Sequence, residues 1–358
     1  MVNHITRLCC YVAFFLIFCC FMGCTPRVQR TDRYLWPPPP DQPRIEWLAA
    51  YHSHLDLEKT TFRSIKEALA GEDAPVALKK PIDVKADSVH NKIYVADLLV
   101  AGVFVFDVLV SELRKINVPA SESPVAIQPV SIALDRQLNL YVLDAGAKRI
   151  LVFDAEENFL RTIRIDSMCP RPIALAIDKT RQRIYVADTQ ESRIVALSAE
   201  GNQLFSIGGP GDATGLFNRP VGLTVNSKGE LIVADAFNAR IQIFDQNGKF
   251  LRNFGRRGTG LGAFQLIKSV AVDPDDNIHV VDGRSNSVNI FNQAGVLLMN
   301  FGAYYAVSNS GKLAPGGFAL PVAIDIDDLG KMYVVDQLNA RVQVFQYLSE
   351  GFTPTKVK

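Results

Sequence analysis

Apolar and polar positions alternate in short runs along most of the chain, and this alternation predicts β-strands. Residues 221–225 read Val-Gly-Leu-Thr-Val, and residues 231–235 read Leu-Ile-Val-Ala-Asp. Turn-forming residues such as glycine, asparagine, aspartate and proline separate the runs. Residues 60–70 differ, because Phe62, Ile65 and Leu69 recur there at helical spacing. The pattern predicts an all-β protein with one short helix.

One unit of this pattern occurs six times. Its central run ends on an aspartate in every copy, at Asp97, Asp144, Asp188, Asp235, Asp282 and Asp336. These aspartates are separated by 47, 44, 47, 47 and 54 residues. Four antiparallel strands of about five residues, repeated at such a period, form the blade of a propeller. We therefore predict a six-bladed β-propeller of four-stranded antiparallel blades over residues 81–347.

The first strand of each unit alternates bulky and small side chains, as in residues 130–134, Val-Ser-Ile-Ala-Leu. Both faces of such a strand can be buried when each sheet packs between two neighbours. This alternation predicts that the blades stack face to face around a ring.

The last unit lacks a fourth strand of its own. Residues 45–51, Ile-Glu-Trp-Leu-Ala-Ala-Tyr, have β character and belong to no unit. We predict that they form the outer strand of the sixth blade and close the ring, which also removes an exposed sheet edge.

Two misplaced charges offer a check on this closure. Lys85 and Asp325 stand four residues after Pro81 and Pro321, where other units carry alanine or threonine. The first and last blades are neighbours in a closed ring, and a buried charge needs a partner. We predict an ion pair between Lys85 and Asp325, with Asp83 as a possible third member.

The amino-terminal segment has the pattern of a secretory signal. An apolar run at residues 8–22 follows Arg7 and ends Phe-Met-Gly-Cys. Fifteen helical residues reach about 22 Å, short of a bilayer core of about 30 Å. The ending resembles the lipobox of bacterial lipoproteins, which implies lipidation of Cys24; Thr25 after it implies the outer membrane. A short uncleaved anchor is the alternative.

These observations divide the chain into six parts. They are a signal peptide (1–23), the lipidated Cys24 with a proline-rich tether (24–44), the ring-closing strand (45–51), a helical connector (52–80), the propeller (81–347) and a carboxy-terminal tail (348–358). Four consecutive prolines at residues 37–40 favour an extended tether.

Composition restricts the possible chemistry. The net charge is +1, and Arg7 is the one charged residue among the first 24, which leaves 37 basic and 37 acidic groups. Such a balance argues against nucleic acid. Five of the 6 cysteines also fall in those 24 residues, so Cys169 has no partner for a disulfide or a cysteine-rich metal site. We predict no cofactor.

The histidines of the mature chain supply no metal or catalytic cluster. They are His52, His54, His90 and His279, and they do not share a metal-ligand spacing. His279 occupies the slot that holds tyrosine in four units. We interpret it as a strand residue, and no catalytic residue is predicted.

The fourth unit shows the repeat best. It reads Asn-Arg-Pro-Val-Gly-Leu at 218–223, Ile-Val-Ala-Asp at 232–235 and Asn-Ala-Arg-Ile-Gln-Ile-Phe-Asp at 238–245. With these motifs the body resembles the NHL-repeat propellers. The resemblance implies a protein-interaction platform in most cases, RNA binding in some, and lyase or metal-dependent hydrolase activity in a few.

Four units carry an arginine five residues after the aspartate. We predict structural pairs between Asp144 and Arg149, Asp188 and Arg193, Asp235 and Arg240, and Asp336 and Arg341. Gly102 and Ser287 replace the arginine in the other two units. Asp97 and Asp282 are therefore candidates for ligand contact, although turn capping by their carboxylates is favoured.

The long connections between units are the candidate recognition surface, because loops on a rigid scaffold carry recognition. Residues 208–212, 255–260 and 303–320 occupy equivalent places. The candidate partner-binding residues are Arg252, Arg256, Arg257, Lys268, Tyr304 and Tyr305. We predict a monomeric, lipid-anchored scaffold that binds an acidic or extended segment of another envelope protein. A hydrolase or lyase with a metal in the central channel is the alternative.

Overall fold

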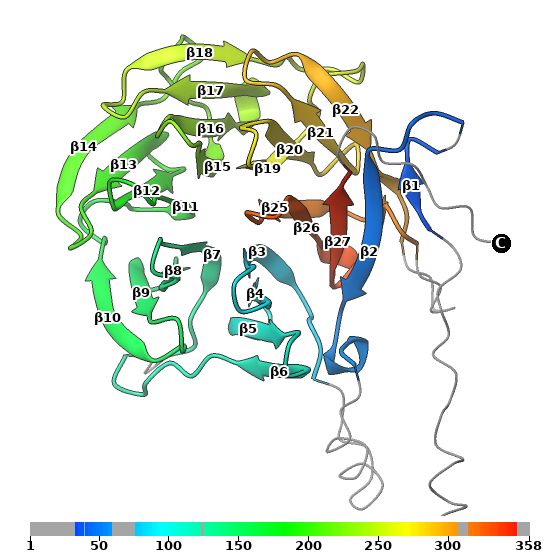
Figure 1. Cartoon of the computed structure of the whole chain (residues 1–358). Helices are drawn as coiled ribbons and strands as arrows, with labels where there is room; N and C mark the ends of the chain where they lie inside the picture. Colours follow the sequence, from blue (N-terminus) through cyan, green and yellow to red (C-terminus); the bar gives the residue numbers. More distant parts are fainter. Residues whose placement is uncertain (1–32, 39, 59–75, 123–124, 307–313, 349–358) are drawn as a thin grey trace, which may run out of the picture. The chain divides into compact units, whose positions relative to one another are not determined.

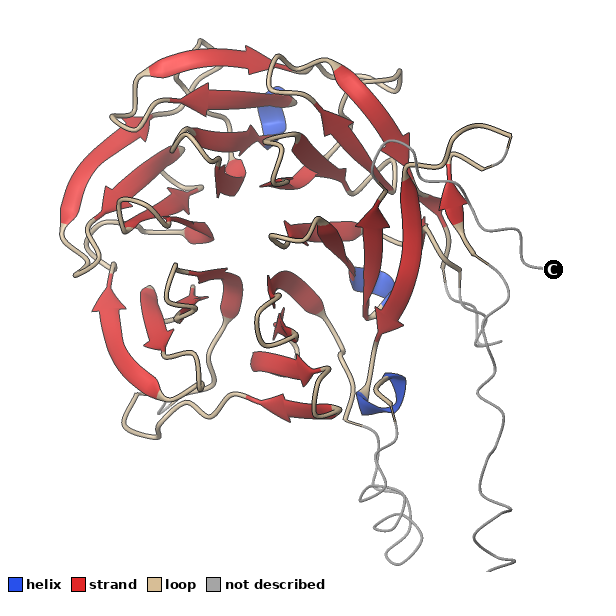
Figure 2. Ribbon diagram, in the orientation of Figure 1, coloured by secondary structure: helices blue, strands red, loops and turns tan. Residues whose placement is uncertain are grey.

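The computed structural model describes residues 33–38, 40–58, 76–122, 125–306 and 314–348. In this part of the chain six antiparallel sheets stand around a central axis, each with its first strand innermost (Figures 1 and 2). The prediction of a six-bladed, all-β propeller is confirmed. The expected signal peptide, about half of the tether, the helix at 60–70 and nearly all of the tail lie outside the described residues.

The strands of each blade follow one another from the axis outward. Blade 1 is β3 (Pro81–Asp87), β4 (Lys92–Asp97), β5 (Gly102–Asp107) and β6 (Glu112–Lys115); blade 2 is β7 (Pro129–Leu134), β8 (Leu140–Asp144), β9 (Arg149–Phe153) and β10 (Phe159–Arg164). Blade 3 is β11 (Pro172–Asp178), β12 (Arg183–Asp188), β13 (Arg193–Leu197) and β14 (Gln203–Gly208); blade 4 is β15 (Pro220–Val225), β16 (Leu231–Asp235), β17 (Arg240–Phe244) and β18 (Phe250–Phe254). Blade 5 is β19 (Ile267–Val272), β20 (Ile278–Asp282), β21 (Ser287–Phe291) and β22 (Leu297–Phe301). Blade 6 contains β25 (Pro321–Ile326), β26 (Lys331–Asp336) and β27 (Arg341–Tyr347).

Strand β2 (Ile45–Tyr51) completes blade 6 as predicted. It pairs antiparallel with β27 from Ile45 opposite Tyr347 to Tyr51 opposite Val342. Figure 1 shows this blue strand against the red end of the chain. The amino-terminal part of the body therefore closes the ring.

The structure differs from the prediction at the carboxy-terminal end of the tether, which forms part of blade 6. Strand β1 (Leu35–Trp36) pairs with β2 and gives blade 6 a fifth strand. The Trp36 ring packs against the rings of Phe301 and Phe345, with centroids 6.3 and 5.9 Å away. Packing of this aromatic side chain attaches the segment to blade 6. Its proline-rich composition predicts an extended spacer instead.

Short 3-10 turns make up the described helical structure. They are η1 (His54–Asp56), η2 (Ala236–Asn238) and η3 (Gln337–Asn339), and a two-stranded parallel ladder joins β23 (Ala303–Tyr304) to β24 (Gly317–Phe318). In the described part of the predicted connector, Ser53 caps η1 and forms an isolated bridge with Ala77. No described helix has the length and apolar character needed to cross a bilayer.

The core lies between neighbouring blades. Ile132 and Leu134 of β7, for example, pack in one buried cluster with Tyr94 and Val105 of blade 1. Five of the six third strands carry a buried phenylalanine at their last residue or within two residues of it, namely Phe106, Phe153, Phe244, Phe291 and Phe345. Full burial of such a side chain contributes about 1.5–3 kcal/mol, so each interface adds several kcal/mol to the closed ring.

Candidate functional site

The innermost strands line two pockets, one at each end of the central axis. The pocket at the carboxy-terminal ends of these strands has a volume of about 320 Å³, and the pocket at their amino-terminal ends has about 520 Å³. We call them the lower mouth and the upper mouth. Lys85 lines both pockets, so it marks the boundary between them.

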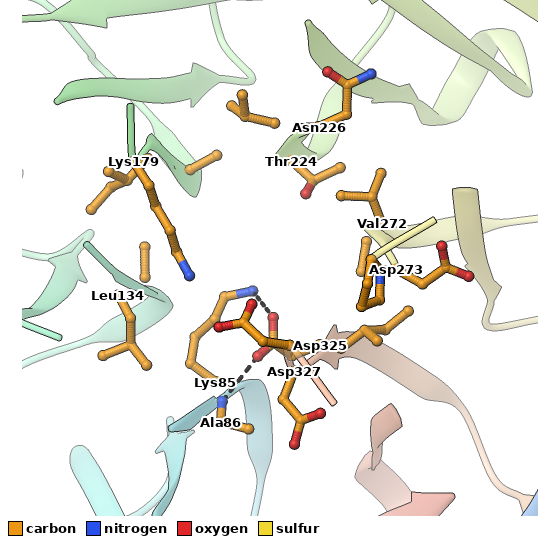
Figure 3. Close-up of a pocket in the computed structure, with 18 of the residues that line it drawn as sticks. Lys85, Ala86, Leu134, Lys179, Thr224, Asn226, Val272, Asp273, Asp325 and Asp327 are labelled. Atoms are coloured by element: carbon orange, nitrogen blue, oxygen red, sulfur yellow. Dashed lines mark hydrogen bonds and ion pairs between the residues drawn. The ribbon is translucent and has the colours of Figure 1, made fainter. Parts of the chain in front are cut away.

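The structure brings Lys85 and Asp325 together at this boundary (Figure 3). The Nζ of Lys85 lies 2.7 Å from Asp325 Oδ1, and the backbone N–H of Ala86 donates to Asp325 Oδ2 at 2.9 Å. Burial by itself lowers the pKa of Lys85, but the charges of Asp325 and Asp83 outweigh it and raise the pKa above its ordinary value. The pair joins the first and last blades, where the closure of the ring requires it.

Asp83 turns toward the other neighbour of blade 1. Its carboxylate accepts hydrogen bonds from the Ser131 hydroxyl and the Ile132 N–H, both at 2.8 Å, and from the Val84 N–H at 2.9 Å. Burial raises the pKa of Asp83 despite these bonds and the nearby Lys85. Asp83 thus fastens blade 1 to blade 2 and forms no hydrogen bond with Lys85.

Five carboxylates and one amide form a ring around the lower mouth and cap its hairpins. They stand six residues after each strand-opening residue, at Asp87, Asp135, Asp178, Asn226, Asp273 and Asp327. Asp327 Oδ1, for instance, accepts from the N–H groups of Leu329 and Lys331 at 2.9 Å. The sequence reasoning missed this ring, although the constant spacing from the opening residue would have revealed it.

The same ring explains His279. Its Nε2 lies 3.0 Å from Asp273 Oδ2, and the hydroxyl of Tyr333, in the equivalent slot, donates to Asp327 at 3.1 Å. Burial by itself raises the pKa of Asp273, but the hydrogen bonds and charge of His279, with bonds from Asn277, hold it below its ordinary value. His279 therefore supports a hairpin, in the role of the tyrosine that it replaces.

A second set of aspartates, at the ends of the second strands, caps turns near the upper mouth. Asp97 accepts from the N–H groups of Lys79 and Lys80 at 2.6 and 2.9 Å. Asp282 accepts from Gln265 and Leu266 before its blade and from two N–H groups of the following turn. Because these backbone bonds engage both carboxylates, the structure favours turn capping over ligand contact.

Three of the four expected Asp–Arg pairs are present. The arginine Nε lies 3.0 Å from the carboxylate in Asp144–Arg149, and 2.8 Å in both Asp235–Arg240 and Asp336–Arg341. Each arginine faces the aspartate across the strand pair, as the spacing implies.

The fourth predicted pair, Asp188–Arg193, does not form. The two residues face each other in the same register, but Arg193 Nη2 donates to the Met168 carbonyl at 3.0 Å. Neither Arg193 Nε nor Asp188 Oδ2 has a hydrogen-bond partner. The short loop that contains the buried Cys169 draws the guanidinium away, and burial with the charge of Asp188 raises the pKa of this thiol to about 12.

Arg252 does not belong to the predicted partner surface. Its guanidinium donates to both Glu230 oxygens at 3.1 and 2.9 Å and to the Gln293 carbonyl at 2.9 Å. Arg161 likewise donates to a carbonyl in the turn of the next blade. Arg252 is therefore part of a contact between blades 4 and 5 on the side of the lower mouth.

The other predicted residues lie on the face of the upper mouth. Arg256 and Arg257 are exposed in the loop after β18, and Arg257 Nη2 donates to the Phe237 carbonyl at 2.7 Å. Tyr304 is 70% exposed in β23, whereas Tyr305 is half-buried and its carbonyl accepts from Asn339. Lys268 lies deeper, in the upper mouth itself.

The upper mouth combines an aliphatic collar with basic residues. The collar consists of the residues that follow each strand-opening residue, namely Ile82, Val130, Ile173, Val221 and Val322, with Lys268 in the sixth place. Lys80, Arg171 and Arg219 stand just before their opening prolines and also line this pocket. Among its described lining residues Asp83 is the one carboxylate, and Asp83 is already hydrogen-bonded to blade 2. Sequence reasoning selected Lys268 here but missed the collar and the other three cations.

The described residues include no group of three or more histidine, cysteine, aspartate or glutamate side chains placed to hold a metal ion. Most described carboxylates around the two mouths accept backbone hydrogen bonds instead. The donor set at the upper mouth is cationic, and Lys and Arg repel a metal ion.

The sequence profile of the NHL repeat family matches residues 217–244, which span β15–β17. The chain carries an NHL repeat within a six-bladed β-propeller. Comparison of the chain with curated proteins finds no sequence match.

Solved structures share the propeller fold of this chain at low identity. A Bacteroides thetaiotaomicron protein of unknown function has a TM-score of 0.61 at 13% identity, covering 85% of this chain and 75% of its own. A Xanthomonas campestris gluconolactonase has 0.57 at 14%, covering 84% and 98%. Virginiamycin B lyase from Staphylococcus aureus has 0.54 at 12%, covering 78% and 86%. At these identities the likeness establishes the fold alone.

Proposed function

We propose that this NHL propeller is a binding scaffold of the bacterial cell envelope, lipid-anchored through Cys24 in the outer membrane. It recognises a partner protein with the face around the upper mouth, which we call the loop face because the inter-blade loops lie there. Arg256 and Arg257 meet an acidic or extended segment of the partner.

Exposed apolar side chains on the loop face support this proposal. Leu99, Phe237, Leu261, Tyr304 and Leu338 are 67, 48, 80, 70 and 69% exposed. All five belong to inter-blade loops or to turns that join second and third strands. Large exposed apolar groups beside basic residues are typical of protein interaction sites.

The hydrogen bonds that the titratable groups already form also favour a scaffold over an enzyme. General acid–base chemistry needs a carboxylate or histidine that can reach a substrate. At both mouths most described aspartates accept hydrogen bonds from backbone N–H groups, and His279 is 1% exposed against Asp273. Asp328 at the lower mouth is exposed. Recognition by surface complementarity requires none of these groups to be free.

Crosslinking in intact envelopes, followed by pull-down and mass spectrometry, tests the scaffold. We expect the double variant Arg256→Glu/Arg257→Glu to lose most partner recovery, because it reverses two exposed charges on the loop face. The matched control is Arg136→Glu/Lys179→Glu, with two exposed charges on hairpins of the opposite face. Equal recovery by both variants would refute the proposed surface.

A hydrolase or lyase is the second candidate function. The pocket of about 520 Å³ at the upper mouth has the size of a small-ligand site, and the fold is shared with a gluconolactonase and virginiamycin B lyase. Metal analysis of the purified body, before and after incubation with Ca²⁺ or Mg²⁺, tests this reading. One metal ion per chain, together with turnover of a lactone, would replace the scaffold proposal.

A further inference from the structure

Lys268 occupies a place that is aliphatic in every other blade. The equivalent side chains line the upper mouth and are all β-branched: Ile82, Val130, Ile173, Val221 and Val322. Lys268 is half-buried among them. An ammonium group in such a collar loses hydration, which needs compensation by a counter-charge or hydrogen bonds.

Gly283 leaves space for the stem of this lysine. A Cβ atom at Gly283 would lie 2.9 Å from Lys268 Cγ and 3.1 Å from Lys268 Cε. The other blades carry a side chain at this position, directly after the aspartate: Leu98, Ala145, Thr189, Ala236 and Gln337. The fifth blade thus departs from the repeat at two contacting positions, and both departures serve the placement of Lys268.

The described residues give Lys268 no ion pair. Burial lowers its pKa, Arg219 lowers it further, and Asp282 acts in the opposite direction. The Asp282 oxygens already accept backbone hydrogen bonds from both adjoining turns. The Arg219 guanidinium stacks over the Phe237 ring, 5.2 Å from its centroid, and no described carboxylate lies within ion-pair distance of it.

We infer that the upper mouth binds a small amphipathic carboxylate, whose head lies between Lys268 and Arg219 and whose aliphatic chain lies against the collar. One anionic head would compensate two cations that now repel each other. The aliphatic side chains select a ligand with an apolar body over a hydrated inorganic anion. A volume of about 520 Å³ accommodates a chain of moderate length. This site does not depend on the scaffold proposal.

Calorimetric titration of the purified protein with sodium octanoate tests the site. Octylammonium, with the same chain and the opposite charge, and acetate, with the same head and no chain, are the matched probes. We expect octanoate to bind at one site per chain and the other two to bind at least tenfold more weakly. Higher salt should weaken octanoate binding, because its head is held by charge.

Variants separate the contributions of charge and position. Lys268→Met removes the charge and keeps the length of the stem, and we expect at least tenfold weaker octanoate binding. Gly283→Ala, at a position without positive φ, displaces the stem and should weaken binding with Lys268 intact. Lys179→Met, at the lower mouth (Figure 3), is the control and should bind as the parent does.

Each other outcome contradicts the inference. Failure of octanoate to bind the parent protein refutes it, as does equal binding by octylammonium or by Lys268→Met. If Lys268→Met does not fold, as judged by its melting curve, parent-like binding by Gly283→Ala refutes the role of Lys268. Loss of octanoate binding with full partner recovery would leave the scaffold intact, so the two proposals fail separately.

Discussion

At the residue scale, single side chains fasten neighbouring blades, and Lys85 with Asp325 is the clearest case. Breaking a buried pair leaves one charge without compensation, at a cost of about 3–5 kcal/mol, whereas replacing both partners by apolar residues is often neutral. The pair is 24 and 15% exposed, which favours the lower end of this range. We expect Asp325→Leu to lose about 3 kcal/mol of unfolding free energy, and Lys85→Met/Asp325→Leu to regain most of it. Urea unfolding measures both, and additive losses would contradict this account.

His279 allows a matched comparison at the same scale. His279→Phe removes the hydrogen bond to Asp273 and leaves a buried acceptor with fewer partners, at a cost of about 1–3 kcal/mol. His279→Tyr restores the residue found in this slot in other blades, where Tyr333 donates to Asp327. We expect the tyrosine variant to unfold within about 1 kcal/mol of the parent protein. A tyrosine variant as unstable as the phenylalanine variant would contradict the proposed role.

The lowered pKa of Glu230 predicts that the free energy of unfolding depends on pH. The hydrogen bonds from Arg252 lower its pKa in the folded protein, with a smaller contribution from Asn226. A lowered carboxylate pKa stabilises the fold above the unfolded value of about 4.3, and this stability disappears as the pH falls through the folded value. We expect Glu230→Gln to be less stable than the parent at pH 6, and the difference to shrink as the pH falls from about 4.3 through the folded value, as measured by urea unfolding at each pH. A pH-independent difference would exclude this ionic contribution.

At the element scale, the outer strands are irregular in the same way. Each of five carries one unpaired extra residue, and in every case it is an exposed leucine: Leu48, Leu160, Leu204, Leu251 and Leu298. Such bulges twist an edge and discourage pairing with another chain. Strand β6 has no bulge and instead exposes Glu112 and Lys115 at its ends.

Strand β2 carries the strongest prediction at this scale. Ile45 is 0% and Trp47 5% exposed, and both belong to the core between blades 5 and 6. We expect a chain that starts after Tyr51 to lose its cooperative thermal transition, and a synthetic peptide of residues 33–52 to restore it. The control chain starts at Arg33 and should melt as the full body does. A cooperative transition without β2 would contradict closure by this strand.

At the scale of the whole molecule, the proposed anchor concerns a segment outside the described residues. Cys24 is the residue that a lipidating enzyme would modify, so Cys24→Ser should release the protein into the soluble fraction of the envelope. Fractionation after labelling with radioactive palmitate measures this. Membrane retention with label in Cys24→Ser would exclude Cys24 as the anchor, and retention without label would indicate an uncleaved apolar segment.

The sequence by itself determined the ring. The period of its aspartates, the alternation along its first strands and the missing fourth strand of the last unit each reflect local geometry, and together they gave the blade number and the closing strand. Lys85 and Asp325 were recognisable because each breaks a repeat at the same slot. Local spacing also implied the three Asp–Arg pairs that form.

The tertiary structure alone decided what each charged group faces. Arg252 was assigned to a partner surface because it is basic and near a loop, but it bonds to Glu230 across its own sheet. Arg193 sits in the expected register and reaches a carbonyl of a loop whose path the repeat does not specify. The collar around Lys268 draws one residue from each of six blades. Repeats fix the position of a residue along its strand, whereas its surroundings depend on how separate sheets meet around the axis.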